Sequence, residues 1–168
     1  MNIVEVHSGN DVETVSTLAK EIWSEHFTPI IGKAQVNYML EKFQSREAIR
    51  QQLKSGSIYL LVEQERQNVG YAGLIPDSKN SSMHLSKLYL QKAVRGQGLA
   101  RELMRYIEAL CQKQKISRIW LTVNRHNTIP IAAYEKMGFI TTSETVQDIG
   151  AGYVMDDFIM EKQLSSPT

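Results

Sequence analysis

The residues from Arg95 to Ala100 form a glycine-containing turn that is suited to binding an anion. The turn follows an apolar extended run from Met83 to Leu90 and opens into an amphipathic helical pattern from Gly98 to Lys113. Gly96 and Gly98 let the backbone approach a bulky phosphate, and the first amides of the helix lack partners within it and lie at the positive end of its dipole. The pattern therefore predicts a turn that binds a pyrophosphate.

Two better-known phosphate-binding patterns do not fit this turn. A phosphate-binding loop of the nucleotide triphosphatase type needs Gly-Lys followed by Ser or Thr, where this chain has Leu99 and Ala100. A dinucleotide fingerprint needs a wider glycine spacing, a βαβ unit and an acidic residue at the end of the next strand, whereas the strand predicted from Ile119 to Asn124 ends in Asn. Both classes of nucleotide site are therefore excluded.

A second set of residues follows the predicted strand from Ile119 to Asn124. Asn127 is expected to cap a helix, and Pro130 is tolerated near its start because proline lacks only an amide that the first turn leaves unpaired. Gly138 stands where a helix needs a left-handed C-terminal residue, and Phe139 is expected to fold back onto the helix end.

Together, the turn and the later helix resemble the signatures of the GCN5-related N-acetyltransferase (GNAT) family. The turn matches the family's Arg/Gln-x-x-Gly-x-Gly/Ala element at Arg95, Gly98 and Ala100. The later segment matches the family's Asn-x-x-Ala-x-x-x-Tyr-x-x-x-Gly-Phe signature and places Tyr134 at its tyrosine position, with Pro130 at the usual alanine position. The match covers two motifs in the expected order along the chain.

The resemblance implies acetyl transfer from acetyl-coenzyme A, which binds as a co-substrate, and no metal. Backbone groups of Leu88 and Leu90 are expected to pair with the pantetheine arm, and an amide near Leu88 to polarise the acetyl carbonyl. Tyr134 is the expected acid that protonates the sulfur; the alternative is a tyrosine packed in the core. The residues expected to bind the cofactor are Leu88, Tyr89, Leu90, Arg95, Gly96, Gln97, Gly98, Leu99, Ala100, Arg101, Asn127 and Tyr134.

The general base is less closely defined by the sequence. Several members of the family keep a glutamate on the strand that corresponds to Met83 to Leu90, and this chain offers His84, Ser86 and Lys87 there. His84 is the predicted base because the ordinary pKa of histidine suits proton transfer near neutral pH. The alternative for His84 is an exposed or hydrogen-bonded strand residue, and His26 at the end of the first helix is a second candidate.

The order of the predicted elements indicates an α/β (α+β) chain with a central mixed, mostly antiparallel sheet flanked by helices, as in the GNAT fold. The expected domain covers residues 1–164, and residues 165–168 are expected to form a loose tail. The expected elements are strands at 2–7, 57–64, 69–74, 83–90, 119–124, 140–147 and 153–162, with helices at 12–25, 30–54 (broken near Ser45), 98–113 and from Asn127 to Gly138.

Composition fits one compact enzyme domain. Hydrophobic residues make up 42% of the 168, enough for one substantial core. With 19 basic residues against 18 acidic ones and no dense basic run, neither nucleic acid nor a membrane surface is an expected partner. The single cysteine, Cys111, lies on the apolar side of its helix, so we expect a buried thiol. The N-terminus lacks a signal-peptide pattern and no apolar run reaches the ~20 residues of a membrane span, so we expect a cytoplasmic protein.

The acceptor is predicted only as a class. We expect a primary amine on a small molecule, attacked directly in a ternary complex. The C-terminal strand and the helical insert with Tyr38 and Phe43 resemble the bacterial spermidine/spermine acetyltransferases, and Asp156 and Asp157 face either such a polycation or water. Two alternatives are a catalytically silent acyl-coenzyme A sensor and a protein or peptide N-acetyltransferase; a homodimer is a further option.

Overall fold

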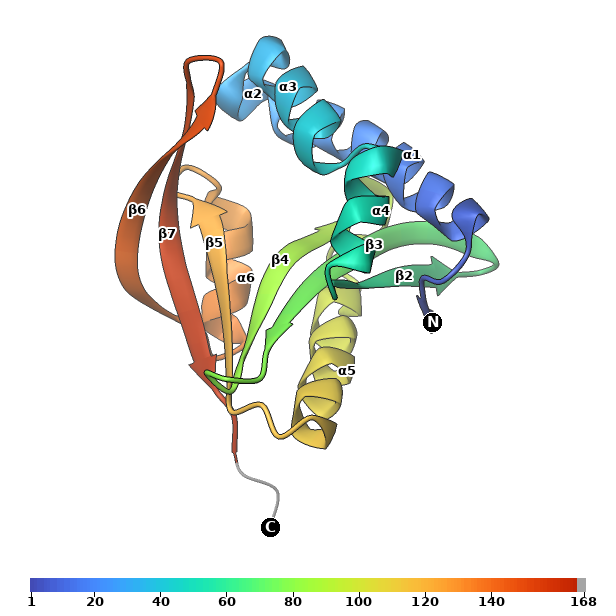
Figure 1. The fold of residues 1–168 in the computed structure, drawn as a ribbon, viewed down its shortest axis with the longest axis vertical. Helices are drawn as coiled ribbons and strands as arrows, with labels where there is room; N and C mark the ends of the chain where they lie inside the picture. Colours follow the sequence, from blue (N-terminus) through green and yellow to red (C-terminus); the bar gives the residue numbers. More distant parts are fainter. Residues whose placement is uncertain (166–168) are drawn as a thin grey trace. The chain divides into compact units, whose positions relative to one another are not determined.

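The computed structural model describes residues 1–165 and divides the chain into two compact units. Unit 1 comprises residues 1–75 and 86–106, and unit 2 comprises residues 76–85 and the chain from residue 107 onward. The strands form a seven-stranded sheet in the order β1-β2-β3-β4-β5-β7-β6 (Figure 1). β4 pairs with β5 in parallel, while β1–β2, β2–β3, β5–β7 and β7–β6 are antiparallel. The predicted mixed, mostly antiparallel sheet with flanking helices is confirmed.

Unit 1 carries the N-terminal strands and helices. Its elements are β1 (Asn2–Glu5), α1 (Gly9–His26), α2 (Thr28–Ile31), α3 (Lys33–Phe43), α4 (Arg46–Lys54), β2 (Ile58–Gln64), most of β3 (Gln67–Asp77), the second half of β4 (Ser82–Leu90), a 3-10 turn (Lys92–Val94) and the start of α5 (Leu99–Lys113). Helices α1, α3 and α4 pack on one another. Ser8 and Ser45 cap α1 and α4 by accepting hydrogen bonds from the amides of Asp11 and Ala48.

The helical region after α1 differs in detail from the prediction. The break expected near Ser45 is confirmed, but Thr28 and Pro29 begin the short helix α2 rather than only ending α1. Proline fits there because the first turn of a helix leaves its amides unpaired. A second break follows at Gly32, whose φ of 86° lies outside the helical region.

Unit 2 contains the C-terminal strands. Its elements are the start of β4, the end of α5, β5 (Arg118–Asn124), α6 (Thr128–Lys136), β6 (Ile140–Gly150) and β7 (Tyr153–Gln163). The hairpin turn predicted over residues 148–152 is shorter, because β6 continues to Gly150. Of the predicted tail, Ser165 is exposed and irregular, and residues 166–168 lie outside the described residues.

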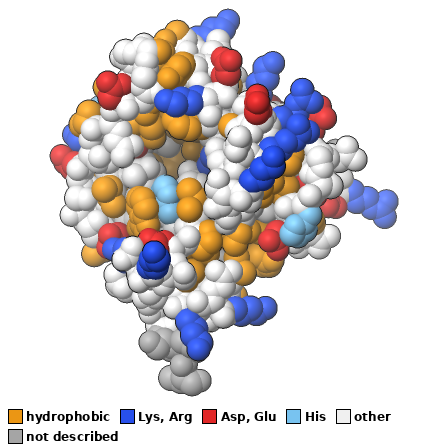
Figure 2. All heavy atoms as spheres, in the orientation of Figure 1, with side chains coloured by type: hydrophobic (Ala, Val, Ile, Leu, Met, Phe, Trp, Pro, Cys, Tyr) orange, Lys and Arg blue, Asp and Glu red, His pale blue; other side chains and the backbone are white. Residues whose placement is uncertain are grey.

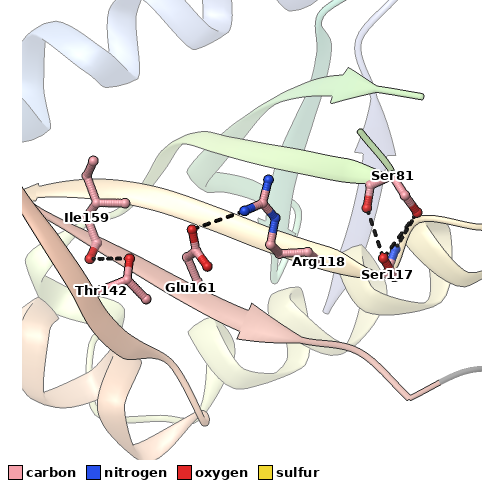
Figure 3. Close-up of polar contacts among 6 residues, drawn as sticks. All are labelled: Ser81, Ser117, Arg118, Thr142, Ile159 and Glu161. Atoms are coloured by element: carbon pink, nitrogen blue, oxygen red, sulfur yellow. Dashed lines mark hydrogen bonds and ion pairs between the residues drawn. The ribbon is translucent and has the colours of Figure 1, made fainter. Parts of the chain in front are cut away.

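Polar contacts fix the register within unit 2 (Figure 3). The Ser117 amide and hydroxyl contact the Ser81 hydroxyl at 3.2 and 3.1 Å, which ties the β3–β4 loop to the start of β5. Arg118 Nη1 lies 3.2 Å from Glu161 Oε1 across β5 and β7. These contacts hold together strands that are distant in sequence.

The two faces of the sheet in unit 2 differ in what covers them. Ile119 pairs with Lys162 and Trp120 with Glu161, so these pairs lie on opposite faces. Lys162 Nζ contacts Glu108 of α5 at 2.5 Å, and a Cβ added at Gly138, just after α6, would lie 3.2 Å from Lys162 Cε. Both helices of unit 2 therefore lie on the Lys162 face. The other face, which carries Trp120, Thr122, Asn124, Asp157, Ile159 and Glu161, is called the helix-free face below.

Candidate active site

The glycine turn before α5 presents an unobstructed backbone. Gly96 and Gly98 have φ values of 79° and 81°, a region that residues with a Cβ rarely adopt. A Cβ added at either glycine would have no heavy atom within 4 Å, so the space beside the turn is open. α5 begins directly afterwards at Leu99. The turn therefore has room for the bulky anion that the sequence predicts.

Side chains of the turn anchor it within unit 1. Arg95 Nε donates to the backbone oxygen of Leu90 at 3.1 Å, and Arg95 Nη1 lies 3.5 Å from His26 Nδ1. Gln97 Oε1 accepts from Gln64 Nε2 at 3.2 Å. Arg95 thus connects the turn to the end of β4 and to the end of α1. His26, a candidate base, lies beside Arg95.

Lys87 on β4 is buried among uncharged oxygens. Its Nζ donates to the backbone oxygen of Phe43 at 2.5 Å, to Gln52 Oε1 at 3.1 Å and to the hydroxyl of Tyr59. Burial lowers the pKa of Lys87 from 10.5 to about 7. All three partners accept hydrogen bonds from the ammonium. Lys87 therefore links β4 to the end of α3, to α4 and to β2.

Tyr89, two residues after Lys87 on β4, belongs to an aromatic cluster in unit 1. The ring centroid of Tyr89 lies 5.3 Å from that of Trp23 and 5.5 Å from that of Tyr71. Trp23 and Phe27 are buried and form part of the hydrophobic core. Tyr38, by contrast, is half-buried on α3.

Tyr134 lies on α6 in unit 2. Its ring packs edge-on against Phe139 at 5.6 Å, and the Phe139 amide donates to the Tyr134 carbonyl at 3.0 Å. Gly138, with φ 98°, makes this reversal, so the predicted helix end is confirmed. The Tyr134 hydroxyl has no hydrogen-bond partner among the described residues. Burial raises its pKa, so the phenol keeps its proton at neutral pH.

Asn127 occupies the N-cap position of α6 but does not cap the helix with its side chain. The predicted side-chain cap is therefore wrong. Its ψ of 68° differs from the 161° of Ser8 and the 159° of Ser45, the two residues whose side chains do cap helices. Asn127 is nevertheless only 6% exposed.

His84 lies in the half of β4 that belongs to unit 2. Its ring stacks on Trp120 with centroids 3.8 Å apart, and its Nε2 is buried without a hydrogen-bond partner. Burial lowers the pKa of His84 from 6.5 to about 4. The imidazole is therefore neutral at pH 7 and only weakly basic. Because His84 shares a face with Trp120, it lies on the face opposite to α6 and its Tyr134.

Asp156 and Asp157 have different surroundings. Asp156 Oδ1 contacts Arg125 Nε at 2.8 Å, and Arg125 also contacts Glu144 at 3.4 Å. Asp157 is only 4% exposed. Burial and the charge of Asp156 raise the pKa of Asp157 to about 6. The sequence predicts no difference between Asp156 and Asp157, but alternation along a strand directs neighbouring side chains to opposite faces.

The predicted site residues thus form separate groups. Unit 1 holds the turn, Leu88 to Leu90 and His26, whereas unit 2 holds His84, Asn127 and Tyr134. Among residues 1–165, no group of three or more His, Cys, Asp or Glu side chains is placed to hold a metal ion. No helix within the same residues has the length and apolar character needed to cross a membrane.

Comparison with known proteins assigns the family. A family model described as an acetyltransferase (GNAT) domain matches residues 27–158, and the chain therefore belongs to the GNAT family. An N-acetyltransferase of Mycobacterium tuberculosis is 34% identical over 96 residues, covering 57% of this chain and 60% of that protein. A spermine/spermidine N(1)-acetyltransferase of Bacillus subtilis is 31% identical over 78 residues, covering 42% and 51% respectively. These matches span about half to three fifths of the relatives' length.

Solved structures support the same fold. The PaiA N-acetyltransferase of Thermoplasma acidophilum, crystallised with coenzyme A, has a TM-score of 0.77 and 24% identity and covers 97% of this chain and 99% of its own. The fold expected from the two motifs is thereby confirmed over nearly the whole chain.

Proposed function

We propose that this chain transfers the acetyl group of acetyl-coenzyme A to a primary amine of a small molecule, by direct attack in a ternary complex. Residues 1–164 act as one acetyltransferase domain in this proposal, in the cytoplasm, where coenzyme A is available. The relatives named for spermine and spermidine make polyamines the first acceptors to test. The observation that carries the chemistry is the unbonded, protonated hydroxyl of Tyr134 at the family's tyrosine position.

The open glycine turn supports the cofactor part of the proposal. Backbone amides from Arg95 to Ala100 and the start of α5 bind the pyrophosphate, because no side chain occupies the space beside Gly96 and Gly98. Backbone groups of Leu88 and Leu90 pair with the pantetheine arm, and the amide near Leu88 polarises the acetyl carbonyl.

Proton transfer involves both faces of the sheet in unit 2. Tyr134, on the face covered by α6, gives its proton to the departing thiolate. The amine must lose a proton before or during attack, and His84 on the opposite face is the base that the sequence predicts. Its pKa of about 4 makes it a weak base, whereas the ammonium of Lys87 has its protons directed at three acceptors.

The polyamine assignment does not rest on a broadly acidic surface. In the view of Figure 2, acidic and basic side chains are interspersed, and a run of Lys and Arg lies where Figure 1 draws α4. That helix contributes Arg46, Arg50 and Lys54. A cationic acceptor therefore needs a local carboxylate rather than a long-range field.

An amine panel tests the proposal. The protein is incubated with acetyl-coenzyme A and spermidine, butylamine, an amino acid, an aminoglycoside or a peptide with a free N-terminus, and thiol release is recorded. We expect release above the amine-free rate with at least one small amine. Binding of acetyl-coenzyme A by calorimetry without release for any amine would refute the enzyme and favour an acyl-coenzyme A sensor. Release with the peptide alone would refute the small-molecule acceptor.

A further inference from the structure

Asp157 is a buried carboxylate with no partner. The residue is 4% exposed, and its carboxylate makes no hydrogen bond or ion pair with any described residue. Removing an ionised carboxylate from water without such partners costs several kcal/mol, so buried carboxylates are normally paired. An unpaired one is therefore expected to have a partner that is not part of the chain.

The surroundings of Asp157 supply no positive charge. Its register partners are Asn124 on β5 and Thr145 on β6, both uncharged. The guanidinium of Arg125, which follows β5, is held by Asp156 and Glu144. Farther along the helix-free face, Glu161 is paired with Arg118. The local charge at Asp157 is therefore negative, which favours a cationic ligand.

Asp157 and Tyr134 belong to different faces of the sheet in unit 2. Asp157 belongs to the helix-free face, whereas Tyr134 lies on the face covered by α6. In the tetrahedral intermediate, the attacking amine and the departing thiolate are bonded to the same carbon. The base that takes a proton from the amine and the acid that gives one to the thiolate therefore approach from different directions. The placement of Asp157 on the helix-free face and of Tyr134 on the other face assigns the base and the acid to different sides of that carbon.

We propose that Asp157 binds the ammonium group of the acceptor and takes the proton that this group loses during acetyl transfer. The inference rests on the proposed acetyltransferase function and identifies its acceptor-binding carboxylate. One N–H bond of the ammonium breaks and its proton passes to a carboxylate oxygen of Asp157. The freed lone pair forms the N–C bond with the acetyl carbon, the C–S bond breaks, and the thiolate takes the proton of Tyr134. The nitrogen loses its second proton to water as the amide forms, and the Tyr134 phenolate regains a proton from water, so one proton is released to the Asp157 carboxylate and no other group of the chain changes its charge.

The first test compares Asp157→Asn with Asp156→Asn, which removes the same charge from the adjacent, paired residue. With an amine acetylated by the wild type, we expect Asp157→Asn to lower kcat/KM for the amine by about 10²-fold or more while KM for acetyl-coenzyme A stays the same. Asp156→Asn should keep kcat/KM within a few-fold. Wild-type kcat/KM should fall below pH 6. This acidic limb of the pH profile should be absent from Asp157→Asn but retained in His84→Gln.

The second test does not depend on turnover. In protein labelled with carbon-13 at aspartate carboxyls, the signal lost in Asp157→Asn identifies Asp157. The pH titration of this signal is followed in protein loaded with coenzyme A. Adding spermidine or butylamine should shift the titration midpoint of the carboxyl to lower pH, because a bound ammonium favours the carboxylate.

The outcomes separate the inference from the proposed function. If the wild type acetylates amines and Asp157→Asn keeps both its kcat/KM and its acidic limb, Asp157 is not the acceptor carboxylate and the acetyltransferase function stands. A limb that disappears in His84→Gln instead would also overturn the inference. If no amine is acetylated, the proposed function fails. If, in addition, neither amine moves the titration midpoint of the Asp157 carboxyl, the inference is overturned as well.

Discussion

The buried ammonium of Lys87 should make the stability of the protein depend on pH. Burial lowers its pKa from 10.5 to about 7. Between pH 7 and pH 10.5, Lys87 is protonated in the unfolded chain but partly or wholly deprotonated in the folded chain. Stability contributed by this group is therefore greatest above pH 10.5 and decreases as the pH falls toward 7.

The size of the effect follows from the same two pKa values. At pH 7 the folded state holds about half a proton at Lys87, and at pH 8.5 almost none, while the unfolded state holds nearly one throughout. At 1.36 kcal/mol per pKa unit, this group adds about 1.5 kcal/mol to the free energy of unfolding between pH 7 and 8.5. Cys111 acts in the opposite sense at higher pH, because burial and Glu108 raise its thiol pKa to about 11.

Urea denaturation of the wild type and Lys87→Met at pH 7, 7.75 and 8.5 measures this contribution. The difference in free energy of unfolding between the two proteins should change by about 1.5 kcal/mol over the series, since all other groups cancel. Lys54→Met, at an exposed lysine in the last turn of α4, is the control and should show no such change. A constant difference between wild type and Lys87→Met would show that Lys87 is not desolvated as described.

Three further predictions concern the turn and unit 2. Gly98→Val should raise the Kd of coenzyme A in calorimetry by about tenfold or more, because a branched side chain fills the space next to the turn and disfavours its φ of 81°. Tyr134→Phe should lower kcat by about 10²-fold to 10⁴-fold with little change in the KM for acetyl-coenzyme A, because the ring packing is kept and the acid is lost. Asp157→Asn should raise the free energy of unfolding by up to about 3 kcal/mol at pH 7.5 and by much less at pH 4.5, since the pKa rise from 3.8 to about 6 costs stability only above the lower value.

Each of these predictions has an outcome that would contradict its physical reason. Gly56 also has a positive φ and open space, so an equal loss of affinity in Gly56→Val would assign the Gly98 effect to backbone strain. Wild-type turnover in Tyr134→Phe would place Tyr134 in the core only. A gain in Asp157→Asn that is equal at both pH values would show that the carboxylate carries no desolvation cost.

The sequence predicts the backbone features of the site because they depend on local conformation. Gly96, Gly98 and Gly138 all adopt the positive φ values that a phosphate-binding turn and a helix end require. The side-chain cap predicted for Asn127 is wrong, because the residue type favours a cap but the ψ of 68° is not the extended value found at Ser8 and Ser45. Local chemistry thus predicts where a turn lies better than how its side chains bond.

Long-range contacts decide the features that the sequence does not reveal. Lys87 is expected at a surface, and only the fold brings the oxygens of Phe43, Gln52 and Tyr59 around its ammonium. The neighbours Asp156 and Asp157 are alike in sequence, but Arg125 pairs with one of them alone. Period-two alternation along a strand was the available signal that their surroundings would differ.

Lys87 and Asp157 show how a structural buried charge differs from one that needs a ligand. The chain supplies three oxygens to Lys87, so its burial is compensated within unit 1. It supplies no donor to Asp157, and an acceptor ammonium would supply that donor. Asp157 and Tyr134 both belong to unit 2 and lie on opposite faces of its sheet, so the proposed base and the proposed acid are separate side chains of the same unit.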